Sequence, residues 1–205
     1  MFMVLYSADE DAFLNAIKKS SEKFSHIDGL ILNAAALEPL CRVGDSDTPL
    51  SSWRKHFEVN FFSLVTAVRG TLPSLRKSEF GGRIVFVSSG AAVKGTAGWG
   101  PYNASKAAMN SLCRTLAEEE PDVVSVALRP GTVDTAMQQA IREQGVKHMT
   151  ESDHQTFMRL HSDGILLKPE LPGGVIASLA LRATKGLSGQ FVSWDDEKCK
   201  DFRLE

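Results

Sequence analysis

The sequence has 205 residues, of which 43% are hydrophobic and 23% charged, and these proportions are typical of a globular chain with a buried core. They exclude a disordered tail, a collagen-like repeat and a coiled coil, and the length favours one domain over residues 1–205. The net charge of −2 lacks the basic excess that binding to nucleic acid requires, so we expect no DNA or RNA partner.

The predicted elements alternate between helices and strands. Apolar residues at helical spacing indicate the helices, and short continuous apolar runs indicate strands that are buried on both faces. In chain order these are a helix over Asp11–Phe24, a strand over Gly29–Leu32, a helix over Ser51–Lys77, a strand over Arg83–Val87, a helix over Tyr102–Glu119, and strands over Val123–Leu128 and Gln190–Val192. Because helices connect successive strands, we predict an α/β fold with a doubly wound parallel sheet.

The least regular stretch is 132–172, with helical fragments over Ala136–Arg142 and Glu151–His161. It follows the Val123 strand, and ligands bind beyond the carboxyl ends of strands in open α/β sheets, so it is placed to cover a pocket. Trp99 is expected either to line that pocket or to fill the core. Four side chains of this stretch are expected either to form a flexible apolar lid or to pack as ordinary helix residues: Met137, Met149, Phe157 and Met158.

The cysteines, histidines and apolar runs exclude several other classes. Cys41, Cys113 and Cys199 are far apart and form no CxxC pair, which argues against a disulfide framework and a zinc site. The five histidines lack metal-site spacing, so we expect surface or packing residues and no metal. No apolar run could span a bilayer, and the N-terminus lacks the basic start and the small-residue cleavage site of a signal peptide, so we expect a cytoplasmic protein without membrane contact.

Tyr102 and Lys106 form a Y-x-x-x-K pair. Residues four apart on a helix share one face, about 5–6 Å apart at Cβ. A neighbouring ammonium favours the phenolate, so we expect Lys106 to lower the pKa of Tyr102 and make it a usable proton donor. Alone, the pair is equally compatible with an ordinary exposed helix face.

Three neighbouring features add weight to the pair. Ser89 ends the Arg83 strand, where its hydroxyl is placed to bind a carbonyl oxygen. Asn60 lies within the apolar run Val-Asn-Phe-Phe, where an amide is costly unless it is hydrogen-bonded. The segment 129–135, Arg-Pro-Gly-Thr-Val-Asp-Thr, follows the next strand.

With these motifs the chain resembles the short-chain dehydrogenase/reductase family, whose active site uses Asn, Ser, Tyr and Lys in this order. Residues 32–35, Leu-Asn-Ala-Ala, are similar to its N-N-A-G motif, and residues 130–135 to its P-G-x-V-x-T motif. Residues 116–123 and 187–192 resemble the sepiapterin-reductase and benzil-reductase branch, including its fungal members. Ser193 stands where a sepiapterin reductase has its pterin-anchoring aspartate, which argues against pterin reduction.

The resemblance implies an NAD(P)H-dependent carbonyl reductase acting on a small aromatic or dicarbonyl substrate, with NADP(H) favoured over NAD(H), in a homo-oligomer. It implies Tyr102 as proton donor, Ser89 holding the carbonyl oxygen, Lys106 on the nicotinamide ribose and Asn60 anchoring a relay water. The implied catalytic residues are Asn60, Ser89, Tyr102 and Lys106, and the implied cofactor-binding residues are Asn33, Ala34, Tyr102, Lys106, Pro130, Gly131, Val133 and Thr135.

The family's first strand and its glycine-rich phosphate-binding turn have no match in this sequence, so the resemblance implies a Rossmann-like sheet truncated at the N-terminus. We therefore expect Gly29–Leu32 to be an exposed edge strand, with Met1–Leu5 either beside it or poorly ordered. Two functions remain open: an active carbonyl reductase, or a catalytically impaired short form that acts only by association.

Overall fold

The structure, a computed structural model, describes residues 10–24 and 26–203. Its centre is a parallel sheet in the order β1-β2-β3-β4, formed by β1 (Gly29–Leu32), β2 (Gly82–Val87), β3 (Val123–Arg129) and β4 (Phe191–Ser193). All four predicted strands are confirmed to within two residues at either end. The prediction for Met1–Leu5 lies outside the described residues.

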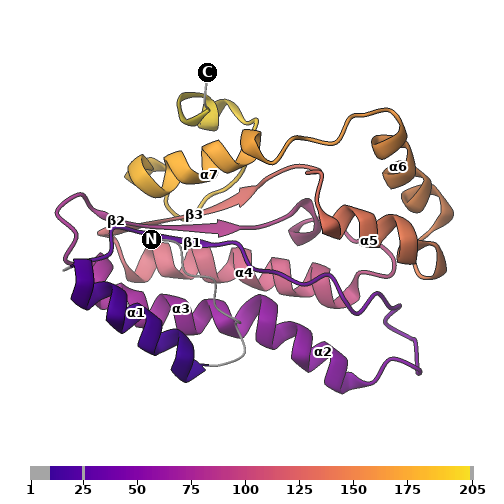
Figure 1. Cartoon of the computed structure of the whole chain (residues 1–205), viewed down its shortest axis with the longest axis horizontal. Helices are drawn as coiled ribbons and strands as arrows, with labels where there is room; N and C mark the ends of the chain where they lie inside the picture. Colours follow the sequence, from indigo (N-terminus) through magenta and orange to yellow (C-terminus); the bar gives the residue numbers. More distant parts are fainter. Residues whose placement is uncertain (1–9, 25, 204–205) are drawn as a thin grey trace.

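Helices cover both faces of the sheet, as Figure 1 shows. One face carries α3 (Ser63–Leu75) and α4 (Gly100–Glu119), with α1 (Glu10–Phe24) packed on α3, and the opposite face carries α7 (Glu170–Arg182). The doubly wound α/β fold is therefore confirmed. The remaining α-helices are α2 (Leu50–Phe57), α5 (Ala136–Gln144) and α6 (Glu151–Ser162).

Alternating side chains of the central strands fill the core on either side of the sheet. Ile84 and Phe86 point into the layer with α3 and α4, whereas Val85 points into the layer with α7, and all three are fully buried. This two-sided burial explains why β2 and β3 are continuous apolar runs. In contrast, β1 has strand neighbours on one side only among the described residues, and Ile31 is 41% exposed. The exposed edge is thus confirmed, and full burial of this strand was a wrong prediction.

The predicted helix over Ser51–Lys77 is one helical rod with an irregular turn in its middle. A π-helical turn, Glu58–Phe62, joins α2 to α3. An extra residue in one turn rotates the following residues by roughly 100° relative to the preceding ones. The core-facing stripe of α3 therefore continues back through Asn60 and His56, and the aromatic rings of Trp53 and Phe57 are left half-buried on another face.

The stretch 132–172 lies at the carboxyl ends of the strands, toward which the arrows in Figure 1 point, and contains α5 and α6. A short parallel bridge between Val133 and Leu167 closes its base. The helical fragments predicted in this stretch are confirmed, and they lie over the edge of the sheet where a ligand of an α/β fold binds. None of the helices within the described residues is long and apolar enough to cross a membrane.

Candidate active site

Helix α4 turns the Tyr102 and Lys106 side chains inward. Pro101 starts the helix, where its missing N–H costs nothing, and residues at three- and four-residue spacing form a buried stripe. Tyr102 is 6% exposed and Lys106 is 2% exposed. The exposed helix face considered as an alternative for this pair is therefore wrong.

The Lys106 ammonium is enclosed between the sheet and the Tyr102 ring. Its Nζ donates a hydrogen bond to the Val87 carbonyl at 2.8 Å and lies 5.7 Å from the centroid of the tyrosine ring. Burial lowers the pKa of Lys106 to about 8, because the charged form loses its hydration.

The pKa of Tyr102 moves in the direction opposite to the one predicted. Burial raises it, and the hydrogen bond with the Ser89 side chain only partly opposes that effect. Spacing alone suggested that the neighbouring ammonium would dominate, but the hydroxyl lies in a site that penalises the phenolate. Tyr102 therefore carries its proton at neutral pH, which is the form that a proton donor to a carbonyl needs.

Ser89 lies two residues beyond β2, at the carboxyl end of the sheet. It is half-buried and has extended backbone, and its Oγ accepts a hydrogen bond from the Ala91 N–H at 3.2 Å, which caps a short 3₁₀ turn over Gly90–Ala92. With its partner Tyr102, Ser89 forms a pair of hydroxyls at one point of the site. Such a pair is suited to hold one oxygen atom of a substrate.

Asn60 holds the loop that follows β1. Its Oδ1 accepts from the Ala36 N–H and its Nδ2 donates to the Ala36 carbonyl, both at 2.8 Å. The expectation that this buried amide is hydrogen-bonded is confirmed. The amide is engaged with main chain, so its first role is to fix the loop, and the relay-water role stays a prediction.

His56 is a central residue that sequence reasoning did not single out. It is 2% exposed and lies between Asn60 and α4, with Nδ1 2.7 Å from the Glu38 carbonyl and Nε2 2.9 Å from Asn60 Nδ2 and 3.1 Å from Ser105 Oγ. Burial lowers its pKa, the bond to Glu38 raises it, and the charge of Lys106 lowers it. The i, i+4 spacing from Asn60 is the signal that could have identified it.

The six residues implied only in cofactor binding lie where β1 and β3 end. The parallel sheet brings these two ends to one edge, which is also the edge of Ser89. Four of the six residues are exposed, namely Asn33, Ala34, Gly131 and Thr135. The other two, Pro130 and Val133, are half-buried. Gly131 has φ +81°, and a Cβ there would approach Leu167 Cδ1 to 2.6 Å, so this turn requires glycine.

An apolar cluster lies next to Tyr102. The Trp99 ring contacts the Tyr102 ring edge-on at 5.7 Å between centroids and the Phe157 ring of α6 at 5.5 Å. Met149 is buried in this cluster, and Met137 and Phe157 pack against it, whereas Met158 is 46% exposed and takes no part. Trp99 is therefore both a buried residue and a neighbour of Tyr102.

Within the described residues, no three His, Cys, Asp or Glu side chains gather as a metal site would need. All three cysteines are buried and free.

Comparison with known proteins decides the family. A family model described as short chain dehydrogenase matches residues 1–145. The chain belongs to the short-chain dehydrogenase/reductase family. It is a short-chain oxidoreductase of the carbonyl-reductase type, in the branch similar to benzil and sepiapterin reductases.

Three relatives illustrate the similarity. An uncharacterized oxidoreductase of Schizosaccharomyces pombe is 44% identical over 180 residues, covering 87% of this chain and 71% of the relative. A benzil reductase ((S)-benzoin forming) of Saccharomyces cerevisiae is 39% identical over 204 residues, covering 97% of this chain and 78% of the relative. The crystal structure of a short-chain dehydrogenase/reductase from the same yeast superposes with a TM-score of 0.94 at 35% identity, covering 100% of this chain and 80% of that one.

Short-chain dehydrogenases use a nicotinamide dinucleotide, and the residues at this edge fit the nicotinamide half of such a cofactor. The buried ammonium of Lys106 has three N–H donors and, among the described residues, donates one to the Val87 carbonyl. The other donors can bind the hydroxyls of a ribose. Asn33 and Thr135 are exposed polar residues at the same edge.

Proposed function

We propose that this protein reduces a small aromatic or vicinal dicarbonyl compound with NADPH, using Tyr102 as the proton donor. The observation that carries the proposal is the burial of Tyr102 against the Trp99 ring, with the Lys106 Nζ 5.7 Å from the centroid of the phenol ring and Ser89 as a hydrogen-bonding neighbour. The benzil reductase activity named for a 39% identical relative supports it.

The proton chemistry follows from the environment of each group. Ser89 binds the substrate carbonyl oxygen, and Tyr102, protonated at neutral pH, donates its proton to that oxygen as negative charge develops on it. Lys106 lies close enough to favour the resulting phenolate, because an opposite charge stabilises an anion strongly in a buried site. Burial keeps the phenol protonated until the substrate binds but also disfavours the phenolate, so the nearby charge of Lys106 is needed to favour the proton transfer.

The cofactor side of the site is built from residues at the ends of β1 and β3. Lys106 and Tyr102 would bind the nicotinamide ribose, and Asn33, Ala34, Pro130, Gly131, Val133 and Thr135 would line the rest of that side. When bound there, the nicotinamide supplies a hydride to the carbonyl carbon. The proposal includes a preference for NADP(H) over NAD(H) and one catalytic domain over residues 1–205. It also includes a cytoplasmic location, and the three free, buried cysteines agree with a reducing compartment.

The substrate preference rests on the cluster around Trp99. Trp99, Phe157 and Met149 present rings and a thioether next to the Tyr102 ring, and these surfaces favour an apolar or aromatic group beside the reacting carbonyl. Polar or anionic carbonyl compounds would lose hydration there without new hydrogen bonds.

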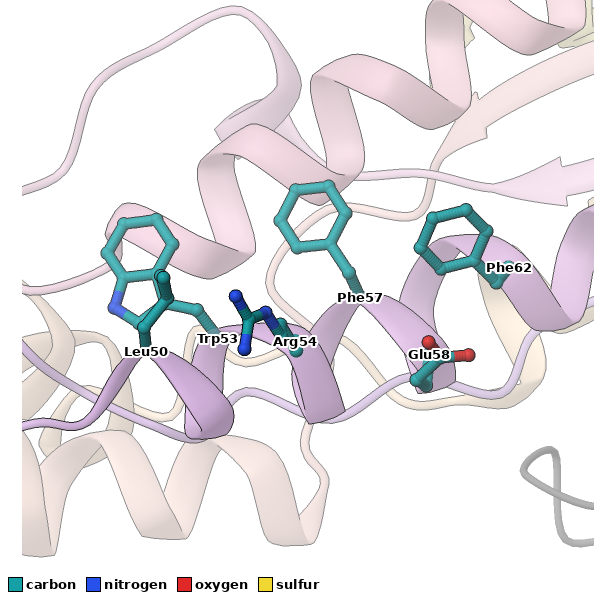
Figure 2. A pocket seen from close by; sticks show the side chains of 6 residues that line it. All are labelled: Leu50, Trp53, Arg54, Phe57, Glu58 and Phe62. Atoms are coloured by element: carbon teal, nitrogen blue, oxygen red, sulfur yellow. The ribbon is translucent and has the colours of Figure 1, made fainter.

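A homo-oligomer is also proposed, formed through the outer face of α2 and the π-helical turn. Figure 2 shows the rings of Trp53, Phe57 and Phe62 projecting to one side, where with Leu50 they line an apolar groove of about 470 Å³. Leu50 is 63% exposed and Phe62 is 50% exposed. Arg54 and Glu58 lie beside this groove, and two copies related by a twofold axis would pair them reciprocally, so the proposed occupant is a second copy of this chain.

The proposal is tested with the purified chain, first by calorimetric titration with NADPH and NADH and then by a panel of carbonyl compounds. We expect binding of NADPH that is tighter than that of NADH, and turnover of benzil and related aromatic dicarbonyls. A chain that binds neither dinucleotide, or that reduces only polar or anionic carbonyl compounds, would overturn the proposal.

A further inference from the structure

His56 connects three separate parts of the candidate site. On one side its ring bonds the loop after β1, through the Glu38 carbonyl at 2.7 Å. On the other side it meets Asn60 in the π-helical turn and Ser105 in α4. Ser105 lies between Tyr102 and Lys106 in the sequence of that helix, and its Oγ donates to the Tyr102 carbonyl at 2.9 Å. The ring itself packs edge-on against the Tyr102 ring at 6.3 Å.

The chemistry of these partners fixes the protonation state of the ring. A carbonyl only accepts hydrogen bonds, so Nδ1 must carry the hydrogen that bonds Glu38. The Asn60 amide nitrogen only donates, so Nε2 must offer its lone pair. The Asn60 amide is itself held in one orientation by its two bonds to Ala36, which leaves one hydrogen on its Nδ2 for His56 Nε2. Ser105 has a single hydroxyl hydrogen, which its Oγ can donate either to Nε2 or to the Tyr102 carbonyl.

We infer that His56, as the neutral Nδ1–H tautomer, is a positioning residue that locks the loop on the proposed cofactor side to the helix carrying Tyr102 and Lys106. Two anchors hold that loop, Ala36 on Asn60 and Glu38 on His56, and both continue the chain from the proposed cofactor-binding residues Asn33 and Ala34. The inference rests on the proposed function, because its catalytic effect is on the distance between the cofactor side and the proton donor.

A lock of this kind has a definite kinetic consequence. Misplacing reacting groups by about 1 Å can cost on the order of 100-fold in rate. Because His56 is enclosed and acts on the site through Glu38, Asn60 and Ser105 and through the edge of the Tyr102 ring, its loss should lower kcat and leave the KM for the carbonyl substrate nearly unchanged.

The hydrogen bonds of the two ring nitrogens can be tested separately. His56→Asn keeps a donor near the Nδ1 position for Glu38, His56→Gln keeps an acceptor near the Nε2 position for Asn60 and Ser105, and His56→Phe keeps the ring shape and neither bond. We expect kcat to fall by about 10- to 100-fold in His56→Phe, with a smaller loss in His56→Asn and His56→Gln. Thr71→Val, which removes a buried hydroxyl bonded to the Ala67 carbonyl in α3, controls for lost stability and should leave kcat unchanged.

Two NMR measurements test, without any substrate, whether His56 holds the loop after β1 in place. The ring nitrogens of His56 should show the Nδ1–H tautomer at neutral pH, and the Ala36 amide should exchange at least tenfold faster in His56→Phe, because Asn60 loses a partner. An Nε2–H tautomer, an imidazolium, unchanged Ala36 exchange or a folded His56→Phe variant with kcat within about twofold of the parent would each overturn the inference. If the parent chain reduces no carbonyl compound, the proposed function fails, and the NMR readouts alone decide on the lock.

Discussion

Lys106 is a charged side chain held almost entirely out of water. Burial lowers its pKa from 10.5 to about 8, which corresponds to a cost of about 3 kcal/mol at neutral pH, since each pH unit is worth about 1.4 kcal/mol. Among the described residues, the contacts that offset this cost are the hydrogen bond to the Val87 carbonyl and the contact with the Tyr102 ring. We infer that burial of this ammonium lowers the stability of the folded protein and is retained because the site needs it for function.

Lys106→Met tests this cost through its pH dependence. Between pH 8 and 10.5 the unfolded chain binds a proton at this lysine and the folded chain does not, so the parent's free energy of unfolding should rise with pH relative to that of the variant. We expect a relative gain of up to about 3 kcal/mol over this range, measured by urea denaturation. A difference between the two proteins that stays constant from pH 7 to pH 11 would contradict this account.

At the residue scale, spacing and polarity predicted which side chains matter but not their surroundings. The Y-x-x-x-K pair and the lone amide in an apolar run drew attention to Tyr102, Lys106 and Asn60, and the structure shows that all three are buried. The direction of the Tyr102 pKa shift was wrong because burial, which outweighs the other causes, comes from contacts made by distant segments. His56 was missed because its i, i+4 spacing from Asn60 is a weak signal by itself, and only the fold brings it to Glu38 and Ser105.

At the scale of elements, α6 covers the aromatic side of the candidate site. Phe157 reaches from this helix to the Trp99 ring, which in turn contacts Tyr102. Helix α6 is also held by contacts at its N-terminal end, since Lys94 Nζ lies 3.9 Å from Asp153 Oδ1 and His154 Nε2 lies 2.9 Å from the Arg142 carbonyl oxygen. In the proposed function, α6 held in this way would determine which substituents fit beside the reacting carbonyl.

Phe157→Ala should selectively weaken the binding of aromatic substrates. Removing the ring takes away one surface of the proposed binding region, and an aromatic contact is worth about 0.5–1.5 kcal/mol, so the KM for benzil should rise up to about tenfold. The KM for a small aliphatic diketone should change little. Met158→Ala, at the exposed neighbouring position, is the matched control. Equal losses for aromatic and aliphatic substrates would argue against this role for α6.

Hydrophobic periodicity predicted the positions of these helices and strands well. It did not predict which face of the helix over Ser51–Lys77 is buried before and after the π-helical turn. Seven helices and strands were found because their apolar patterns are long or continuous. The π-helical turn at Glu58–Phe62 was not, since one extra residue barely changes an average spacing of 3.6. It nevertheless turns Asn60 into the site and moves Trp53 and Phe57 out of the core.

At the scale of the whole molecule, the groove on α2 and the π-helical turn makes association a testable property. Arg54→Glu places two acidic residues beside the groove, at positions 54 and 58, and should shift the protein toward monomer in analytical ultracentrifugation. The double variant Arg54→Glu, Glu58→Arg restores opposite charges across a twofold axis and should recover the association. If the single and double variants sediment alike, this face is not the interface.

The overall topology was predictable because each crossover helix between parallel strands admits essentially one arrangement. The exposed edge of β1 followed from the same reasoning and is confirmed by Ile31 among the described residues. The substrate was less predictable, because Trp99, Met149 and Phe157 meet only through the packing of α6 over the sheet.

The most direct test of the account is the rate of NADPH oxidation with benzil by the purified chain and by Tyr102→Phe. The variant keeps the ring that packs on Trp99 and loses the hydroxyl that would donate the proton, and general acid catalysis contributes about 100- to 10,000-fold. We predict turnover by the parent chain, a loss of that size in the variant, and a free energy of unfolding within about 1 kcal/mol of the parent's. Comparable turnover by both proteins would contradict the assignment of Tyr102 as the proton donor.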